Sequence, residues 1–324
     1  MSVEREPLAA PEVAEGSSRD AAIARLVTRL SSEYVLRALQ LLIEQYGDIR
    51  SGLVAQAINT ANAAHLNVHT EEGRVAGGLD GVIPDGMRRP IGIARLADSA
   101  GVPFESTRRI VQRLVDEGVC VRVDGGVIVP SARAARPETV RTVTANAGYV
   151  RKLARDLEAV GLVEVAPAAR ERLVDDGAQE LALARLVARR SAAYLLRAVG
   201  LLAETYGDIR TGILAQTIVV ANTAYLDTRN GGGRRYAGVD ENPPDELRRP
   251  ISVARLAESL GGSFETKRRH VQRLIDDGIC IRVDGGLIVP GAVLETPKAV
   301  SAMLVNVGYV RGFVRDLSVI RLSQ

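Results

Sequence analysis

The sequence predicts a mainly α-helical protein with short β-hairpins, built from two tandem copies of one unit. Residues 41–56 read LLIEQYGDIRSGLVAQ and return at residues 201–216 as LLAETYGDIRTGILAQ. This offset of 160 (201 − 41) holds without a gap from Ala22/Ala182 to Leu162/Leu322. Apolar residues recur at helical spacing over long stretches. Each copy also carries one Asp-Gly turn between β-branched residues, which is a strong hairpin signal.

Length and composition fit two folded domains. The chain has 324 residues, of which 46% are hydrophobic, so each copy can bury a core of its own. Aromatic residues make up only 3%, and the cores are therefore expected to be aliphatic. We expect a disordered tail at 1–20, a first domain at 21–162, a partly helical linker at 163–181 and a second domain at 182–324.

Charge and cysteine content restrict the functional classes. The formal net charge is +3 although the pI is about 9.0, so any nucleic-acid-binding surface has to be local. Cys120 and Cys280 occupy the same position in each copy, each between β-branched residues, which predicts two small buried side chains. The chain shows no disulfide framework, no signal peptide and no apolar run of membrane-spanning length. A protein of the cytoplasm, associated with the nucleoid and without membrane contact, is expected.

Each unit is expected to begin with two long helices. In the first copy Asp20 caps a helix that runs to about residue 46, where Gly47 breaks it. Asp48 then caps a second helix, residues 49–66, which is apolar over most of its circumference. Such a helix is buried, either between other elements or against the other copy. The polar loop 67–88 follows, where the two copies differ most.

The most similar part of the two copies has the order helix, turn, helix, hairpin. A short helix at 93–99 ends at Gly101, and a second helix at 105–117 ends at Gly118. Strands at 119–123 and 127–129 then flank Asp124-Gly125-Gly126, and a last helix is expected at 137–160. The helix-turn-helix and hairpin span 89–130 in the first copy and 249–290 in the second.

This order resembles the winged helix-turn-helix DNA-binding domain of bacterial transcription regulators of the IclR and MarR kind. The resemblance covers about 45 residues in each copy. It implies two tandem winged-helix domains with flanking helices, which form a pseudo-dimer within one chain. It also implies that the second helix of each motif enters the major groove of double-stranded DNA.

Helical periodicity divides that second helix into two faces. Phe104, Thr107, Val111 and Leu114 are expected to point inward. The outer face carries Arg and Gln, which read guanine and adenine and also contact phosphate. The candidate DNA-binding residues of the first copy are Glu105, Ser106, Arg108, Arg109, Gln112 and Arg113. Those of the second copy are Glu265, Thr266, Lys267, Arg268, Arg269, Gln272 and Arg273. Lys267 replaces Thr107, and His270 replaces Ile110.

Further arginines are candidates for phosphate contacts. They precede or open the first helix of the motif, as Arg88, Arg89 and Arg95 in one copy and Arg248, Arg249 and Arg255 in the other. Arg122 and Arg282 are the only basic residues of the hairpins. Because the hairpin tip is acidic, at Asp124, a purely structural hairpin is the alternative to a DNA-binding wing.

The sequence favours a sequence-specific double-stranded DNA-binding transcription regulator whose two recognition helices read two similar half-sites. A pseudo-two-fold relation predicts an inverted repeat in the DNA, whereas translation predicts a direct repeat. A plasmid- or phage-type replication initiator is an alternative. A winged-helix protein-interaction module of a chromosome-organising complex is another.

Other chemistries have little support. With three histidines and no catalytic constellation, no enzyme activity and no cofactor are expected. His65 and His69 lack a third ligand, so no metal is expected. Three polar pairs lie on apolar helices: Gln56/Gln216, Asn62/Asn222 and Asn146/Asn306. Satisfied hydrogen bonds in a core or interface are favoured for them over a small-ligand pocket. A small-molecule effector and a homodimer stay open.

Overall fold

A computed structural model describes residues 18–66, 81–162, 177–226, 232–258 and 264–320. The side chains of 177–179, 232, 257–258, 264–267 and 319–320 are outside this description. The elements of the first copy are α1 (Ser18–Ala21), α2 (Ala24–Tyr46), α3 (Ile49–Ala63), η1 (Asp85–Met87), α5 (Ile93–Ala100), α6 (Phe104–Asp116), β1 (Val121–Val123), β2 (Gly126–Ile128), η2 (Ser131–Ala135) and α7 (Pro137–Ala159). Those of the second are α9 (Gly177–Tyr206), α10 (Ile209–Thr223), α11 (Gly232–Arg235), η3 (Asp245–Leu247), α12 (Val253–Glu258), α13 (Phe264–Asp276), β3 (Ile281–Val283), β4 (Gly286–Ile288), α14 (Gly291–Leu294) and α15 (Pro297–Ile320). The expectation of a mainly helical protein with short hairpins is confirmed.

The expected breaks between helices are confirmed where the local signals are strong. Gly47 ends α2 in the left-handed conformation, with φ of 81°. The Asp48 carboxylate accepts hydrogen bonds from the amides of Arg50 and Ser51, which caps α3. The expected cap at Asp20 is wrong, because Asp20 lies inside α1 and α2 begins after Ile23 without a side-chain cap.

One other boundary differs from expectation. The helix expected to run to residue 66 ends at Ala63, where the chain turns. In the second copy α9 begins at Gly177, inside the linker expected to be partly helical. Its long apolar face packs against both copies, which extends the helix beyond the repeat boundary. The expected tail up to residue 17 and linker residues 163–176 lie outside the described residues.

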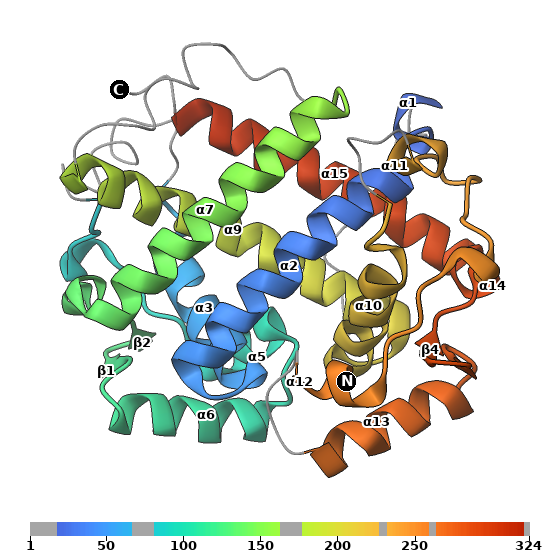
Figure 1. The fold of residues 1–324 in the computed structure, drawn as a ribbon. Coiled ribbons are helices and arrows are strands. Elements are labelled where there is room, and N and C mark those ends of the chain that lie inside the picture. Colours follow the sequence, from blue (N-terminus) through green and yellow to red (C-terminus); the bar gives the residue numbers. More distant parts are fainter. Residues whose placement is uncertain (1–17, 67–80, 163–176, 227–231, 259–263, 321–324) are drawn as a thin grey trace, which may run out of the picture.

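The first helices of the two copies, α2 and α9, cross at the centre of the molecule (Figure 1). The last long helix of each copy, α7 or α15, packs against the first long helix of both copies. Helix α7 packs on α2 of its own copy and on α9 of the other, while α15 packs on α9 and on α2. Helix α3 contacts α2, α5, α6 and α9, which confirms that it is buried between its own copy and the other.

Hydrogen bonds between the copies are reciprocal. The Asn146 side chain accepts from the Tyr34 hydroxyl at 3.1 Å and donates to Ser191 of the other copy at 2.9 Å. The equivalent Asn306 accepts from Tyr194 at 3.1 Å and donates to Ser31 at 3.0 Å. An exchange of equivalent contacts is the pattern that a two-fold relation produces.

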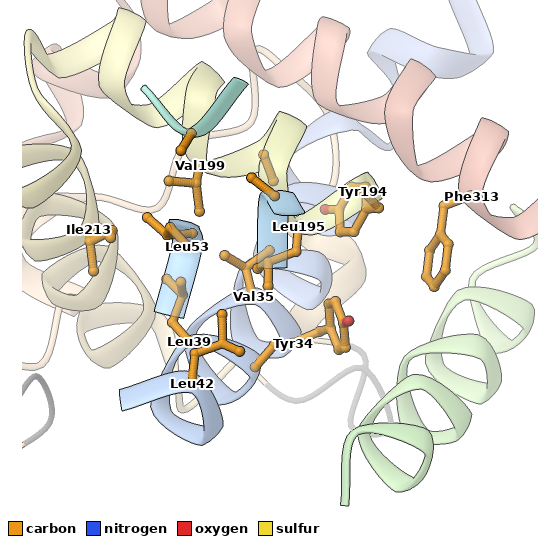
Figure 2. Packing of buried hydrophobic residues seen from close by; sticks show 14 of the residues in the cluster. Tyr34, Val35, Leu39, Leu42, Leu53, Tyr194, Leu195, Val199, Ile213 and Phe313 are labelled. Carbon is orange, nitrogen blue, oxygen red and sulfur yellow. The ribbon is translucent and has the colours of Figure 1, made fainter. Parts of the chain in front are cut away.

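Aromatic side chains pack beside these hydrogen bonds. Tyr34, Tyr194 and Phe313 converge at the crossing of the helices, as Figure 2 shows. The ring centroids of Tyr194 and Phe313 lie 5.3 Å apart, and those of Tyr34 and Tyr194 6.1 Å apart. All three side chains are buried. One continuous core therefore includes residues of both copies.

Each hairpin is attached to the helices by one buried asparagine. Strands β1 and β2 pair antiparallel, and Ile91 forms a bridge to Val127. The Asn62 amide donates to the carbonyls of Arg89 and Val127, at 2.8 and 3.1 Å, and accepts from the Val129 amide at 2.9 Å. Asn222 makes the same three bonds in the second copy. The expectation of satisfied hydrogen bonds in the core is confirmed for this pair.

Glycine is required at the turn of each hairpin. Gly126 has a φ of 146°, and an added Cβ would lie 2.2 Å from the carbonyl oxygen of Ile91. Gly286 approaches Ile251 in the same way, at 2.3 Å. A larger residue would separate the hairpin from the segment that leads into α5 or α12.

The substitution Asn62→Ala is expected to lower the free energy of unfolding by about 3 kcal/mol, because it removes three hydrogen bonds made by one buried side chain. The Val127 carbonyl keeps its bond from the Ile91 amide, whereas the bonds to the Arg89 carbonyl and from the Val129 amide are lost. Asn222→Ala should cost about as much, since the contacts are the same. Urea unfolding measures both, with the exposed Gln40→Ala as the control on a helix surface. A loss below about 0.5 kcal/mol, the usual size of a surface effect, would contradict this role.

Candidate nucleic-acid interface

The turn before α6 is fixed by local contacts. Gly101 ends α5 with φ of 62°, and the Val102 amide donates to the Ala97 carbonyl. The Thr107 hydroxyl then donates to the Val102 carbonyl at 3.1 Å. Val102 and Thr107 are both buried, so the angle between α5 and α6 is set by packing as well as by hydrogen bonds.

The predicted inner face of α6 is confirmed at Thr107, Val111 and Leu114, which are all buried. It is wrong at Phe104, which is 49% exposed. Phe104 is the first residue of the helix, and the core side chains begin one turn later. The helical period alone does not show where the core ends.

The outer face of α6 carries exposed charged side chains. Arg108 pairs with Glu105 at 3.1 Å, and both side chains stay more than half exposed. In the described part of the chain, no hydrogen bond or ion pair holds Arg109, which is exposed. Ser106 is half-buried at the edge of this face. Arg109 is therefore the first-copy candidate best placed to contact a partner molecule.

Two other outer residues are held within the protein. Arg113 forms an ion pair with Asp48 at 2.9 Å and a hydrogen bond with Ser51, which attaches α6 to the first turn of α3. Gln112 donates to Asp116 at 2.9 Å and accepts from Arg122 of the hairpin at 3.0 Å. Arg113 and Gln112 position the helix, and Arg122 is tied to the same network.

The second copy repeats much of this arrangement. Arg268 and Arg269 are exposed on α13, and Gln272 donates to Asp276 at 2.9 Å. Arg273 lies 4.0 Å from Asp208, a looser pair than that of Arg113. Arg282 is exposed on β3. The side chains of Glu265, Thr266 and Lys267 lie outside the described residues.

The arginines before each motif divide into two groups. Arg89, Arg95, Arg249 and Arg255 are exposed, and the Arg249 guanidinium lies over the Tyr225 ring at 5.1 Å. The expectation that Arg88 and Arg248 could contact phosphate is wrong, because their side chains are only 7% and 0% exposed. They turn into the protein interior, and sequence spacing gave no signal of this.

Further expectations concern the cysteines, metal binding and membrane spans. Cys120 and Cys280 are buried and unpaired, as expected, and burial raises the pKa of each thiol to about 11. His69 lies outside the described residues. Across the described ranges, no cluster of His, Cys, Asp or Glu could hold a metal ion. None of the helices in those ranges is both long and apolar enough to cross a bilayer.

Asp48 and Asp208, which cap α3 and α10, make the stability of the protein depend on pH. Burial alone would raise the pKa of Asp48, but hydrogen bonds from Ser51 and Arg113 outweigh it, and the pKa is lowered. The pKa of Asp208 is lowered in the same way, by Thr211 and Arg210 against the effect of burial. A lowered pKa in the folded state stabilises the fold above the unfolded-state pKa. That stabilisation is lost as the pH falls through the folded-state pKa.

Asp48→Ala is expected to cost about 1 kcal/mol of stability at neutral pH, because it removes a helix cap and releases Arg113. The difference from the unmodified chain should shrink as the pH falls from about 4, the unfolded-state pKa, through the lower pKa of the folded-state carboxylate. Urea unfolding over a pH series measures it, with the exposed Asp98→Ala as the control. A penalty that does not change with pH would count against the ionised cap.

Comparisons with protein-family models, curated proteins and solved structures find no match for the chain. What the Arg-bearing surface can do therefore follows from its own geometry. Helices α6 and α13 lie along the same side of the molecule, opposite the C-terminal ends of α7 and α15 (Figure 1). Each turns exposed guanidinium groups outward from that side.

Proposed function

We propose that the chain is a sequence-specific double-stranded DNA-binding transcription regulator made of two winged helix-turn-helix domains. The observation that carries this proposal is the position of α6 and α13 on one side of the molecule, each with two adjacent exposed arginines. Arg108 and Arg109 are those of the first copy, and Arg268 and Arg269 are those of the second. In this fold class the helix after the turn is the one that enters the major groove.

The reciprocal contacts between the copies support a pseudo-dimer. Asn146 with Ser191, and Asn306 with Ser31, are equivalent bonds in opposite directions. A two-fold relation places the recognition helices in opposite orientations, so the favoured DNA site is an inverted repeat. The changes of Ser106 to Thr266, Thr107 to Lys267 and Ile110 to His270 favour slightly different half-sites.

Different residues serve different parts of this interface. Arg109 and Arg269 are proposed to reach base edges, where guanidinium groups bind guanine in a bidentate manner. Arg89 and Arg95, with their counterparts Arg249 and Arg255, supply sequence-independent phosphate contacts. Arg113 mainly holds α6 against α3 through its ion pair with Asp48. Its loss would therefore weaken DNA binding indirectly, by allowing α6 to shift.

A second candidate is a protein-interaction module, and one observation favours it. The outer strand of each hairpin exposes two apolar side chains, Val121 and Val123 in one copy and Ile281 and Val283 in the other. Apolar residues on an exposed strand suit a protein partner better than phosphate. A gel-shift experiment with genomic fragments separates the two functions, since absence of any shift at low salt supports the interaction module.

The double variant Arg109→Ala/Arg269→Ala is expected to lose specific DNA binding, because it removes the base-reading guanidinium of both recognition helices. Each lost bidentate contact costs about 1–3 kcal/mol of discrimination. Fluorescence anisotropy with a selected DNA site measures the loss. Arg155→Ala/Arg315→Ala is the matched control, because it removes the same charge from exposed equivalent positions on α7 and α15.

If the control weakens binding as much as the test variant, only the net charge matters and α6 and α13 are not the reading helices. If the test variant keeps its affinity for the selected site at moderate salt, the assignment of these helices is overturned.

Selection of genomic fragments with the purified chain is expected to recover an inverted repeat bound by one chain. Its half-sites should be centred about 34 Å apart, or a multiple of this, because each recognition helix enters one major groove on the same side of the duplex. Sequencing gives the site and sedimentation gives the stoichiometry. Recovery of direct repeats would contradict the two-fold arrangement.

A further inference from the structure

Two equivalent cavities lie where the copies meet. The first, of about 110 Å³, lies between α2 of the first copy and α9, α10 and α15 of the second. The other, of about 150 Å³, lies between α9 of the second copy and α2, α3 and α7 of the first. Their linings correspond position by position, with Arg29, Gln216 and Asn306 in one and Arg189, Gln56 and Asn146 in the other. Each cavity has walls from both copies.

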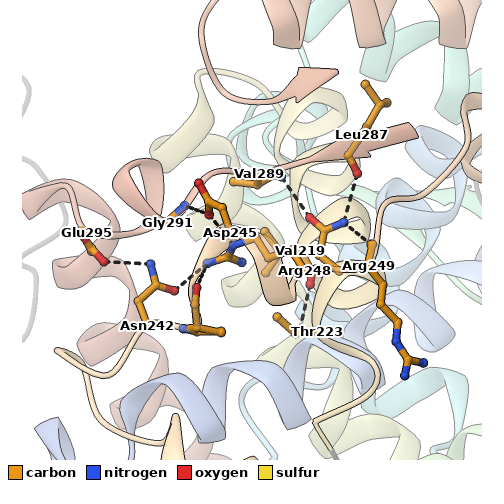
Figure 3. A network of polar contacts seen from close by, with 12 residues as sticks. Val219, Thr223, Asn242, Asp245, Arg248, Arg249, Leu287, Val289, Gly291 and Glu295 are labelled. Atoms are coloured by element: carbon orange, nitrogen blue, oxygen red, sulfur yellow. Dashed lines mark hydrogen bonds and ion pairs between the residues drawn. The ribbon is translucent and has the colours of Figure 1, made fainter. Parts of the chain in front are cut away.

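In the 110 Å³ cavity the buried arginine of the loop has a close ion pair and three hydrogen bonds through Nε and Nη2, while its buried Nη1 has no hydrogen-bond partner among the described residues. Arg248 donates to Asp245 at 2.8 Å, to the Asn242 side chain at 2.7 Å and to the Pro243 carbonyl at 3.1 Å, as Figure 3 shows. Asn242 is itself held by Glu295 at 3.0 Å. The charge of this arginine is compensated within its own copy.

The equivalent arginine of the 150 Å³ cavity lacks that arrangement. Val82 stands in the place of Asn242, and Ala135 in the place of Glu295. Arg88 is 3.6 Å from Asp85 and 3.4 Å from the Asn59 side chain, and its buried Nε has no hydrogen-bond partner. The Arg88 guanidinium therefore has a longer ion pair than that of Arg248, 3.6 Å against 2.8 Å, and fewer hydrogen bonds within the described part of the protein.

Further positive charge surrounds Arg88. Arg133, Arg185 and Arg189 also line the 150 Å³ cavity, and none of its described lining residues is Asp or Glu. Burial, together with the neighbouring guanidinium groups of Arg190 and Arg88, lowers the pKa of Arg189 to about 10. Arg133 is balanced at the edge by Glu138, at 3.4 Å. Buried guanidinium groups that repel one another favour an anion between them.

We propose that the 150 Å³ cavity is a binding site for a small organic anion with a compact apolar group. Its carboxylate or phosphate lies between Arg88 and Arg189, and its apolar part packs against Val143, Ala192 and Leu195. A cavity of about this volume accommodates a benzene-sized group. The 110 Å³ cavity does not bind the anion, because its loop arginine is already paired.

Titration calorimetry of the intact chain tests the site with benzoate, phenyl phosphate and benzamide, the last being the neutral isostere of benzoate. An anion of about nine non-hydrogen atoms should bind one site per chain with a Kd of about 1 mM or lower. Benzamide is expected to bind at least about tenfold more weakly, since the charge supplies the recognition.

Two sets of variants locate the site. Arg189→Gln should weaken benzoate binding at least about tenfold, whereas Arg29→Gln, its counterpart in the 110 Å³ cavity, should leave it unchanged. Val82→Asn/Ala135→Glu introduces the residues that engage Arg248 in the second copy, and it should weaken binding without removing any arginine. Both positions are half-buried or exposed, so this variant is expected to fold.

Equal binding of benzoate and benzamide would reduce the site to an apolar cavity and overturn the proposal. So would an equal loss in Arg29→Gln, full binding by Val82→Asn/Ala135→Glu, or no saturable binding of either anion up to about 10 mM. None of these measurements involves DNA. A negative result would therefore overturn the anion site without bearing on the proposed DNA-binding function.

Discussion

Two buried asparagines hold the copies together, and the positions of the other elements depend on them. Asn146 and Asn306 each join a tyrosine of their own copy to a serine of the other, beside the packed rings of Tyr194 and Phe313. Buried polar groups stabilise a structure only when they are paired, so this network permits one alignment of α2, α7, α9 and α15. A shift of one copy against the other would separate both asparagines from their serine partners and leave two buried amide groups unpaired.

A short series of contacts connects that alignment to the side of the molecule on which α6 and α13 lie. Helix α3 packs on α9 of the other copy, and its N-terminal cap, Asp48, holds Arg113 of α6. At the other end of α3, Asn62 holds the hairpin. One buried helix, α3, thus positions both α6 and the hairpin of the first copy. The exposed Arg109 needs no partner of its own, because its neighbours fix the helix on which it lies.

Local signals predicted much of this from the sequence. Gly47, Asp48 and Gly101 act through bonds to nearby residues, and their roles are confirmed. The burial of Arg88 and Arg248 was missed, although the contacts that hold them lie within their own copies. Arg88 and Arg248 lie in loops, where no helical or strand periodicity of the sequence distinguishes buried from exposed side chains. The exposure of Phe104 was missed for a related reason, since the period continues past the end of the core. The asparagine pairs were identified, but only the three-dimensional structure distinguishes a hairpin clamp from a contact between copies.

We infer that the core shared by both copies fixes α6 and α13 at one separation. Spin labels on Gln112→Cys and Gln272→Cys test it by pulsed electron resonance, because Cys120 and Cys280 are buried. One narrow distance distribution at about 34 Å is expected, because this is the separation of successive major grooves on one side of a duplex. A distribution spread over tens of ångströms would show that the two copies move independently, and it would contradict a fixed separation of α6 and α13.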